Sequence, residues 1–232
     1  MGILEDRSRR RFLKASSMLG LTVAFNPGAT VETFERHARI VENCEQRKEN
    51  LMSTEMSSLV ISHRVSRLDI AVHGNYDDFR RQFETAVPMW DRDHWVELVE
   101  RKAAWSEVIA AMAASAPHDF LLYWKLDLAP LMSLAGNKRR ATEYLMGNHV
   151  VAETMYRHDP AVALYVPLRC AIYESDAGTR FNIEQPSTTV SALGRDDITE
   201  IGIDLDHKLA RLLTALGADV PAVLAGSIAT AK

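Results

Sequence analysis

The sequence predicts an α+β domain, a two-layer sandwich whose mixed or largely antiparallel sheet has helices packed on one face. Three observations predict it. Residues 68–72 alternate apolar with polar or small side chains, the period of a half-buried strand. Residues 168–174 and 179–185 are two more strand-like runs, joined by the turn 175–178, whose glycine tolerates positive φ. Residues 196–216 carry Ile and Leu at steps of three or four, which is typical of an amphipathic helix.

The first half of the domain is expected to hold two helices and a strand. Asn75 caps a helix over 76–86 that ends before Pro88, and one long helix runs from Asp91 to Pro117. The run 120–126 has strand length. Its alternation places Phe120, Leu122, Trp124 and Leu126 on one face and Leu121, Tyr123, Lys125 and Asp127 on the other.

The second half adds a short helix or loop over 129–136, a strand over 141–146 and a helix over 149–158. Pro186 ends the hairpin, and Gly217 caps the long final helix. Hairpin strands are antiparallel neighbours, so the sheet is expected to be mixed or antiparallel.

The length of 232 residues suits one domain with appendages. We divide the chain into a signal segment over 1–28, a helical or linker extension over 29–58, the domain over 59–217 and a C-terminal tail over 218–232. The tail is rich in Ala and Val, and we expect it to be poorly packed.

The N-terminal segment resembles a twin-arginine export signal. Residues 8–14 read Ser-Arg-Arg-Arg-Phe-Leu-Lys and precede a weakly apolar stretch that ends at Phe25. The motif predicts recognition by the twin-arginine translocation machinery and a periplasmic or cell-envelope location. A start at Met52 or Met56 would instead leave a cytoplasmic protein. No run approaches the roughly 18 apolar residues of a transmembrane span.

Composition argues against several function classes. The net charge of −4 and pI of about 6.1 show no basic excess, so no nucleic-acid partner is expected. Two cysteines, Cys44 and Cys170, make no disulfide framework, and Cys170 falls in a strand expected to be buried.

Several short motifs occur in a characteristic order. They are Tyr144–His149, Arg157–Pro160, Leu164–Arg169, Ile172-Tyr173, Glu184–Ser187 and Ile201-Gly-x-x-Leu-Asp206. In order and spacing the stretch from Val65 to Leu216 resembles the family known as domain of unknown function 302. The resemblance implies a small two-layer α/β domain that is often dimeric, and it carries no established activity. Residues 90–115 look like an insertion, and Gly147-Asn148-His149 stands where many members have Gly-Asn-Pro.

The sequence predicts neither a metal site nor a cofactor. Asp91-x-Asp93-His94 and Asp204-x-Asp206-His207 place ligand types close together, but residues two apart on a helix point to different faces. The aspartates of the first group fit a helix start, and Asp204 and His207 fit a solvent-facing side. There is no HExxH, GxSxG, GxGxxG or Walker loop.

Polar residues at strand ends are the candidate ligand contacts, because such loops often carry binding residues. The candidates are Lys125, Asn148, His149, Arg169, Gln185 and Ser187. Asn148 is interpreted first as a helix cap, Gln185 and Ser187 also fit a role in satisfying backbone groups, and Arg169 also fits pairing with Asp127 or Glu184.

Two functions remain open at this point. One is a non-catalytic envelope protein that binds a small ligand or a protein partner, as a homodimer. The other is an enzyme using general acid–base chemistry around His149, assisted by Glu184 or Asp127. Convergence of His149, Gln185, Ser187 and Lys125 on one pocket would favour a ligand or enzyme site, and their dispersal would favour an interaction protein.

Overall fold

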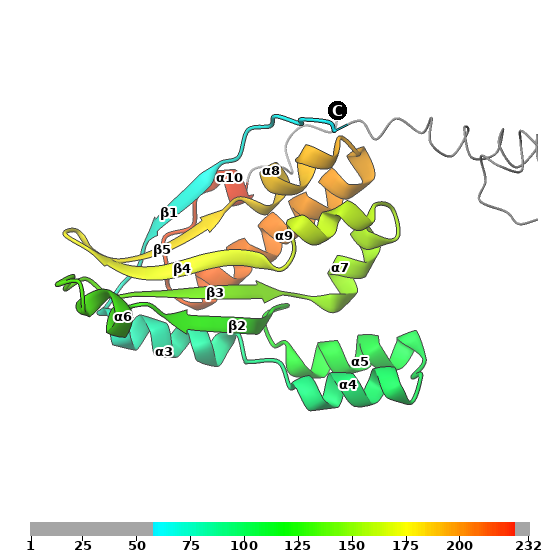
Figure 1. The fold of residues 1–232 in the computed structure, drawn as a ribbon, viewed down its shortest axis with the longest axis horizontal. Helices are drawn as coiled ribbons and strands as arrows, with labels where there is room; N and C mark the ends of the chain where they lie inside the picture. The colour runs from blue at the N-terminus through cyan, green and yellow to red at the C-terminus, as the bar shows by residue number, and fades with distance from the viewer. Residues whose placement is uncertain (1–57, 226–232) are drawn as a thin grey trace, which may run out of the picture. The chain divides into compact units, whose positions relative to one another are not determined.

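A computed structural model describes residues 58–225 of the chain (Figure 1). The elements below belong to the unit formed by residues 61–232. The predicted export signal, the predicted extension up to residue 57 and Cys44 fall outside the described residues. Within the described residues, no helix has both the length and the apolar character to cross a bilayer.

Five strands form one antiparallel sheet in the order β1-β5-β4-β3-β2. The strands are β1 (Arg67–Ala71), β2 (Leu121–Asp127), β3 (Ala141–Gly147), β4 (Leu168–Ser175) and β5 (Gly178–Glu184). The expected hairpin is β4–β5, and Gly178 has the positive φ of 108° that its turn requires. The α+β prediction is confirmed, with every strand pair antiparallel.

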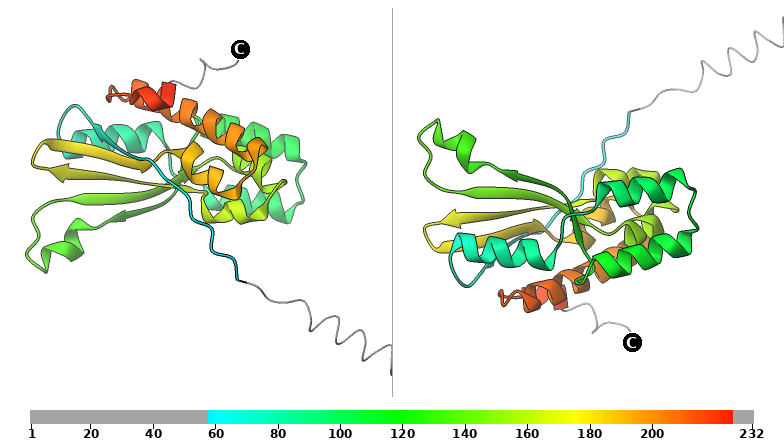
Figure 2. Two further views of the ribbon diagram at one scale, coloured as in Figure 1. Left: turned by 90° about the horizontal axis from the view of Figure 1, so that it is seen from above. Right: turned by 90° about the horizontal axis from the view of Figure 1, so that it is seen from below.

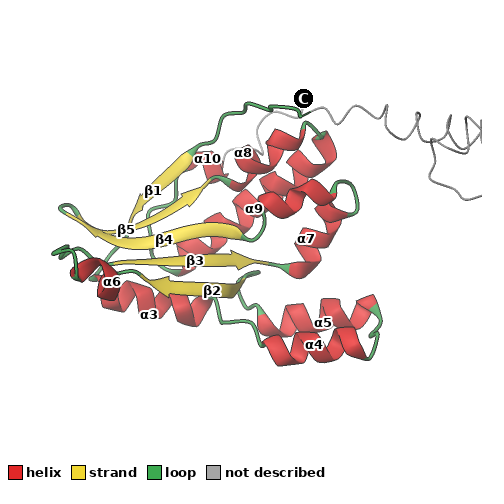
Figure 3. Ribbon diagram, viewed as in Figure 1, coloured by secondary structure: helices red, strands yellow, loops and turns green. Residues whose placement is uncertain are grey.

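Helices cover one face of this sheet. Helices α3 (Tyr76–Ala86) and α9 (Asp196–Ala215) lie on that face, and no described helix lies over the strands on the other (Figures 1 to 3). The core between the two layers contains Phe79 and Phe83 of α3, Leu209 of α9, and Tyr144 and Phe181 of the sheet, each at most 1% exposed. Cys170 is buried in the same core, as expected.

The opposite face of the sheet is here called the open face. The register places on it Arg67 and Asp69 of β1, Trp124 and Leu126 of β2, Leu145 of β3, Arg169 and Tyr173 of β4, and Arg180 of β5. Asp69 accepts hydrogen bonds from the Tyr173 hydroxyl at 3.0 Å and from Arg180 Nε at 3.1 Å. Trp124 and Leu126 are 40% and 42% exposed.

The prediction of one helix from Asp91 to Pro117 is wrong. The segment forms a hairpin of α4 (Arg92–Glu100) and α5 (Trp105–Ser115). Lys102 turns the chain with a φ of 53°, and the Ala103 amide donates to the Leu98 carbonyl at 2.9 Å. No glycine or proline marks this turn in the sequence, and the apolar stripe on the two helices runs through it.

The predicted alternation in β2 is also wrong beyond Leu122. A β-bulge lies between Leu122 and Trp124, so Leu122 pairs with Met146 while Trp124 pairs with Leu145. Tyr123 is the extra residue. Lys125 and Asp127 therefore lie on the covered face with Leu122, whereas the sequence pattern put them opposite it.

Short helices and 3₁₀ turns connect the strands and the long helices. Helix α6 (Ala129–Ser133) follows β2, while α7 (His149–Tyr156) and the 3₁₀ turn η1 (Pro160–Leu164) connect β3 to β4. After β5 come α8 (Pro186–Val190) and η2 (Ser191–Leu193), which periodicity did not predict.

The C-terminal tail packs better than its composition indicated. Within the described residues it forms α10 (Ala222–Ala225), and Leu224 is fully buried in the main core. The prediction of a poorly packed tail is therefore wrong for Ala218 and Leu224, which are buried, whereas Val220 and Val223 are exposed. Leu224 and Ala218 extend the apolar layer formed by α9, and their side chains supply the burial that holds this segment.

Candidate functional site

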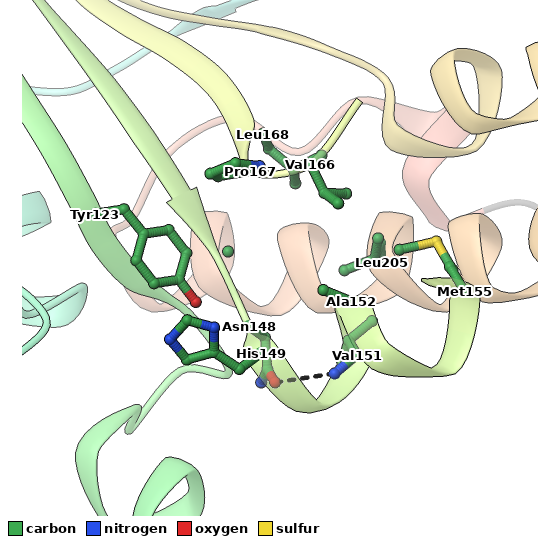
Figure 4. Close-up of a pocket in the computed structure, with 11 residues that line it drawn as sticks. Tyr123, Asn148, His149, Val151, Ala152, Met155, Val166, Pro167, Leu168 and Leu205 are labelled. Carbon is green, nitrogen blue, oxygen red and sulfur yellow. Dashed lines mark hydrogen bonds between the residues drawn. The ribbon is translucent and has the colours of Figure 1, made fainter. Parts of the chain in front are cut away.

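A small pocket lies where β3 ends and α7 begins (Figure 4). Its volume is about 200 Å³. The wall is mainly apolar and is completed from three further segments, namely β2, the chain leading into β4, and helix α9. The lining residues are Tyr123, Gly147, Asn148, His149, Val151, Ala152, Met155, Val166, Pro167, Leu168 and Leu205. Small-molecule sites commonly have such apolar walls with a few fixed polar groups.

Asn148 builds the corner of the pocket. Its Oδ1 accepts hydrogen bonds from the Val150 and Val151 amides at 2.9 and 3.1 Å, and its Nδ2 donates to the Asp119 carbonyl at 2.8 Å. The expected N-cap role is confirmed, and it fixes His149 as the first residue of α7. Because both ends of the amide are engaged within the protein, Asn148 positions the site.

His149 is enclosed by aromatic rings. Its ring centroid lies 4.8 Å from that of Trp95, 4.9 Å from that of Tyr123 and 5.8 Å from that of Trp90. Its Nε2 is buried and has no hydrogen-bond partner among the described residues. Burial lowers the pKa of His149, so the imidazole is neutral at pH 7. A neutral imidazole offers one N–H donor and one acceptor nitrogen.

Tyr123 supplies the second polar atom. Its hydroxyl points toward the His149 imidazole (Figure 4), is buried, and finds no hydrogen-bonding side chain within the described part of the chain. Burial raises the pKa of Tyr123, so the phenol stays protonated. Gly147 gives this ring its space, since a Cβ there would lie 3.1 Å from Tyr123 Cε2. The bulge and this glycine together turn Tyr123 toward the pocket.

Comparison with known proteins places most of these elements in one family. The family model described as "Domain of unknown function DUF302" matches residues 99–216, half of the chain. The chain belongs to this family. The DUF302 match begins inside α4 and not at residue 65, so β1 and α3 lie outside it, and α5 lies within it. The pocket residues from Tyr123 to Leu205 all lie inside.

A solved structure gives a second comparison for this DUF302 chain. This chain is similar to the crystal structure of an uncharacterized conserved DUF302 protein from Bacillus stearothermophilus, with 13% sequence identity and a TM-score of 0.47. The similarity covers 65% of this chain and 97% of the other. No curated protein matches the chain.

Two of the candidate residues lie together, away from the pocket wall. Gln185 Nε2 donates to Asp206 Oδ2 at 2.7 Å, Ser187 Oγ donates to the same oxygen at 2.6 Å, and the Ser187 amide donates to Oδ1 at 3.0 Å. Asp206 is 1% exposed. The network joins the DUF302-like motifs Glu184–Ser187 and Ile201–Asp206 and docks α8 on α9.

Asp206 is the residue that sequence analysis missed as the partner of Gln185 and Ser187. The sequence does contain a pattern that indicates burial of Asp206. The residue lies at helical spacing from Gly202, Leu209 and Leu213, which form the buried side of α9. A carboxylate on that side needs buried donors. His207, which follows Asp206 in the motif Asp204-x-Asp206-His207, is expected from the sequence to face solvent. Its side chain is only partly exposed, and its Nε2 is buried.

Lys125 and Arg169 lie apart from the pocket and from each other. Lys125 forms a 2.7 Å ion pair with Glu84, which also accepts a hydrogen bond from the Tyr144 hydroxyl at 2.8 Å. Arg169 is exposed on the open face. Of the six candidates, the structure therefore brings only Asn148 and His149 to the pocket, and Tyr123 joins them.

The carboxylates considered as assistants to His149 are also elsewhere. Asp127 pairs with Arg80 at 3.4 Å, and Glu184 is exposed at the end of β5. Among the residues that line the pocket there is no carboxylate. The arrangement can bind and orient a polar group through a neutral imidazole and a phenol, and it provides His149 with no carboxylate partner.

Proposed function

We propose that this protein binds a small, mostly apolar molecule in the pocket between β3 and α7. The observation that carries the proposal is a pair of buried polar atoms in residues that line an apolar cavity, Tyr123 Oη and His149 Nε2, for which the described residues offer no hydrogen-bonding side chain. A buried polar atom without a hydrogen bond costs about 1–3 kcal/mol. A ligand with one hydrogen-bonding group at this end of the pocket would recover that cost.

The experiment is a titration with n-butanol and N-methylacetamide, small neutral probes that suit a cavity of this size, followed by imidazole NMR signals of histidine-labelled protein. We expect the His149 signal to shift selectively among the eight histidines. Tyr123→Phe should weaken binding about tenfold through the lost hydrogen bond. Tyr173→Phe, which removes a hydroxyl from the open face, should not. A His149 signal that stays fixed with both probes refutes the proposal.

The enzyme alternative is the weaker of the two. General acid–base catalysis by His149 would gain from a carboxylate that orients the imidazole, and the candidates Asp127 and Glu184 are not among the residues that line the pocket. The polar candidates His149, Gln185, Ser187 and Lys125 do not converge on one pocket, so the ligand-binding proposal rests on His149 together with Tyr123. The aromatic enclosure of His149 supports a role in recognition, because rings around a neutral imidazole provide apolar contact area.

We further propose that the protein acts in the cell envelope after export by the twin-arginine machinery. The proposal is supported by residues 8–14 alone. Intact mass of the protein from fractionated cells tests it, with Arg9→Lys/Arg10→Lys as the variant. A mature N-terminus between residues 25 and 51 in the envelope fraction is the expected result. A cytoplasmic product that is full-length or starts near Met52 would refute export.

Homodimerisation is the third part of the proposal. It is supported by the family resemblance and by the exposed Trp124 and Leu126 on the open face. Light scattering after size exclusion should give twice the chain mass, and Trp124→Glu should give a monomer. Val220→Glu, at an exposed apolar side chain outside that face, is the matched control. A wild-type monomer at micromolar concentration refutes this part.

A further inference from the structure

A second and larger cavity adjoins the pocket. Its volume is about 960 Å³, within the range of small-molecule sites, and it lies between the α4–α5 hairpin and the segment formed by α7 and η1. Its walls include Trp95, Val99, Trp105, Val108, Tyr156 and Val162, and we call it the hairpin groove.

The groove and the pocket share part of their walls. His149, Ala152 and Val166 line both cavities. The His149 ring packs against both Trp95 of the groove and Tyr123 of the pocket. Ala152 contributes only a methyl group to this shared wall.

The groove presents apolar surface to solvent. Val99 is 78% exposed, Trp105 44% and Tyr156 54%, and all three line the groove. Contiguous apolar surface of this kind marks a binding site. Of the charged side chains on the wall, Glu153 is already bonded to Arg157, and Glu100 and Lys102 are exposed.

The inner end of the combined site carries no formal charge at neutral pH. The pocket wall has no Lys, Arg, Asp or Glu among its described residues, and its polar atoms belong to Tyr123, His149 and the engaged Asn148. An ionised group buried there would lose its hydration without gaining a counter-charge, which is costly. A hydroxyl, ester or amide would satisfy the phenol and the imidazole.

We propose that the ligand is an elongated amphiphile with an uncharged polar end. The polar end occupies the pocket at Tyr123 and His149, and the apolar chain lies along the hairpin groove past Ala152. This inference rests on the proposed function of the pocket and defines its ligand class.

The test is a binding series with full-length protein, using linear alcohols from butanol to decanol and ionised decanoate at pH 8. The fluorescence of the groove tryptophans and the His149 NMR signal report binding. Affinity should rise about fourfold per methylene, the equivalent of about 0.8 kcal/mol for each buried CH₂. Decanol should bind at least tenfold more tightly than decanoate.

Two variants test the path of the chain. Ala152→Leu narrows the border between pocket and groove and should weaken decanol at least tenfold, and it should weaken butanol as well, because Ala152 also lines the pocket. Ala110→Leu, on an exposed position of α5 away from the groove wall, adds the same atoms and should change neither. Trp105 lines the groove and not the pocket, so Trp105→Ala should weaken decanol while leaving butanol within twofold, and it keeps the test available if Ala152→Leu does not fold.

The outcomes separate this inference from the function beneath it. Butanol that shifts His149, with no rise in affinity along the series, overturns the amphiphile and leaves the binding function intact. Tighter binding of decanoate than decanol also overturns it. An absence of binding by every alcohol, including butanol at His149, overturns both proposals. A groove covered by a second copy of the chain would give a flat series and a dimer that Trp105→Ala dissociates, which likewise overturns the amphiphile.

Discussion

Replacing Asp206 with alanine removes the acceptor of three hydrogen bonds that dock α8 on α9. Gln185 Nε2 retains an acceptor, because Ser187 Oγ lies 3.2 Å from it, and the serine hydroxyl can rotate. The backbone amide of Ser187 donates to Asp206 Oδ1 at 3.0 Å in the wild type, and the substitution removes this acceptor without offering another. A buried amide without a hydrogen-bond acceptor costs about 1–3 kcal/mol. With the loss of the carboxylate acceptor included, we expect Asp206→Ala to lower the free energy of unfolding by about 3 kcal/mol.

Urea unfolding followed by circular dichroism measures this difference. Asp206→Ala should lower the unfolding midpoint without changing the slope of free energy against urea. Asp204→Ala is the matched control, because the Asp204 side chain is 56% exposed and its one ion pair among the described residues is with Lys208, at 3.5 Å. Its effect should stay within about 0.5 kcal/mol. In addition, Ser187→Ala combined with Asp206→Ala should cost less than the sum of the two. An Asp206→Ala protein within 0.5 kcal/mol of wild type would refute the reasoning.

Three further outcomes are expected. Gly202→Ala should destabilise by about 1–3 kcal/mol in thermal melts, since a Cβ there would lie 2.5 Å from Val190 Cγ2, and a stabilised variant would contradict that packing. Asn148→Ala should cost about 1–2 kcal/mol by losing the α7 cap, with Asn75→Ala, the cap of α3, as the comparison; equality with wild type would exclude the cap. Because the pKa of His149 is lowered in the folded state, the unfolded state takes up the histidine proton first as pH falls below about 6.5. Between pH 7 and 5, the free energy of unfolding of the wild type should therefore fall more steeply than that of His149→Leu, by at most about 1.4 kcal/mol per pH unit. Parallel plots of unfolding free energy against pH for the two proteins would contradict this.

Elements with a repeated local pattern could be predicted from sequence. The alternation of β1, the turn of the β4–β5 hairpin and the long stripe of α9 each depend on residues near in sequence. The split between α4 and α5 could not, because the turn at Lys102 uses a positive φ on a residue type that rarely marks it.

The sequence predicted only part of the pocket, because the other part depends on contacts between residues far apart in the chain. Asn148 and His149 stand at a strand-to-helix junction, which local pattern identifies. Tyr123 reaches them through a bulge that depends on pairing with β3, and Asp206 meets Gln185 and Ser187 across separate elements. Such contacts depend on the tertiary fold, and no single window of sequence contains them.

The bulge in β2 also bears on how this fold can change over evolution. Tyr123 is a supernumerary residue in an edge strand, so deleting it would restore a regular ladder with β3. Leu122 and Lys125 would keep their sides of the sheet, and the core would lose nothing that α3 and α9 cover. A single-codon deletion could therefore abolish the binding phenol while sparing the scaffold, and relatives with and without that codon would share an architecture but not a ligand.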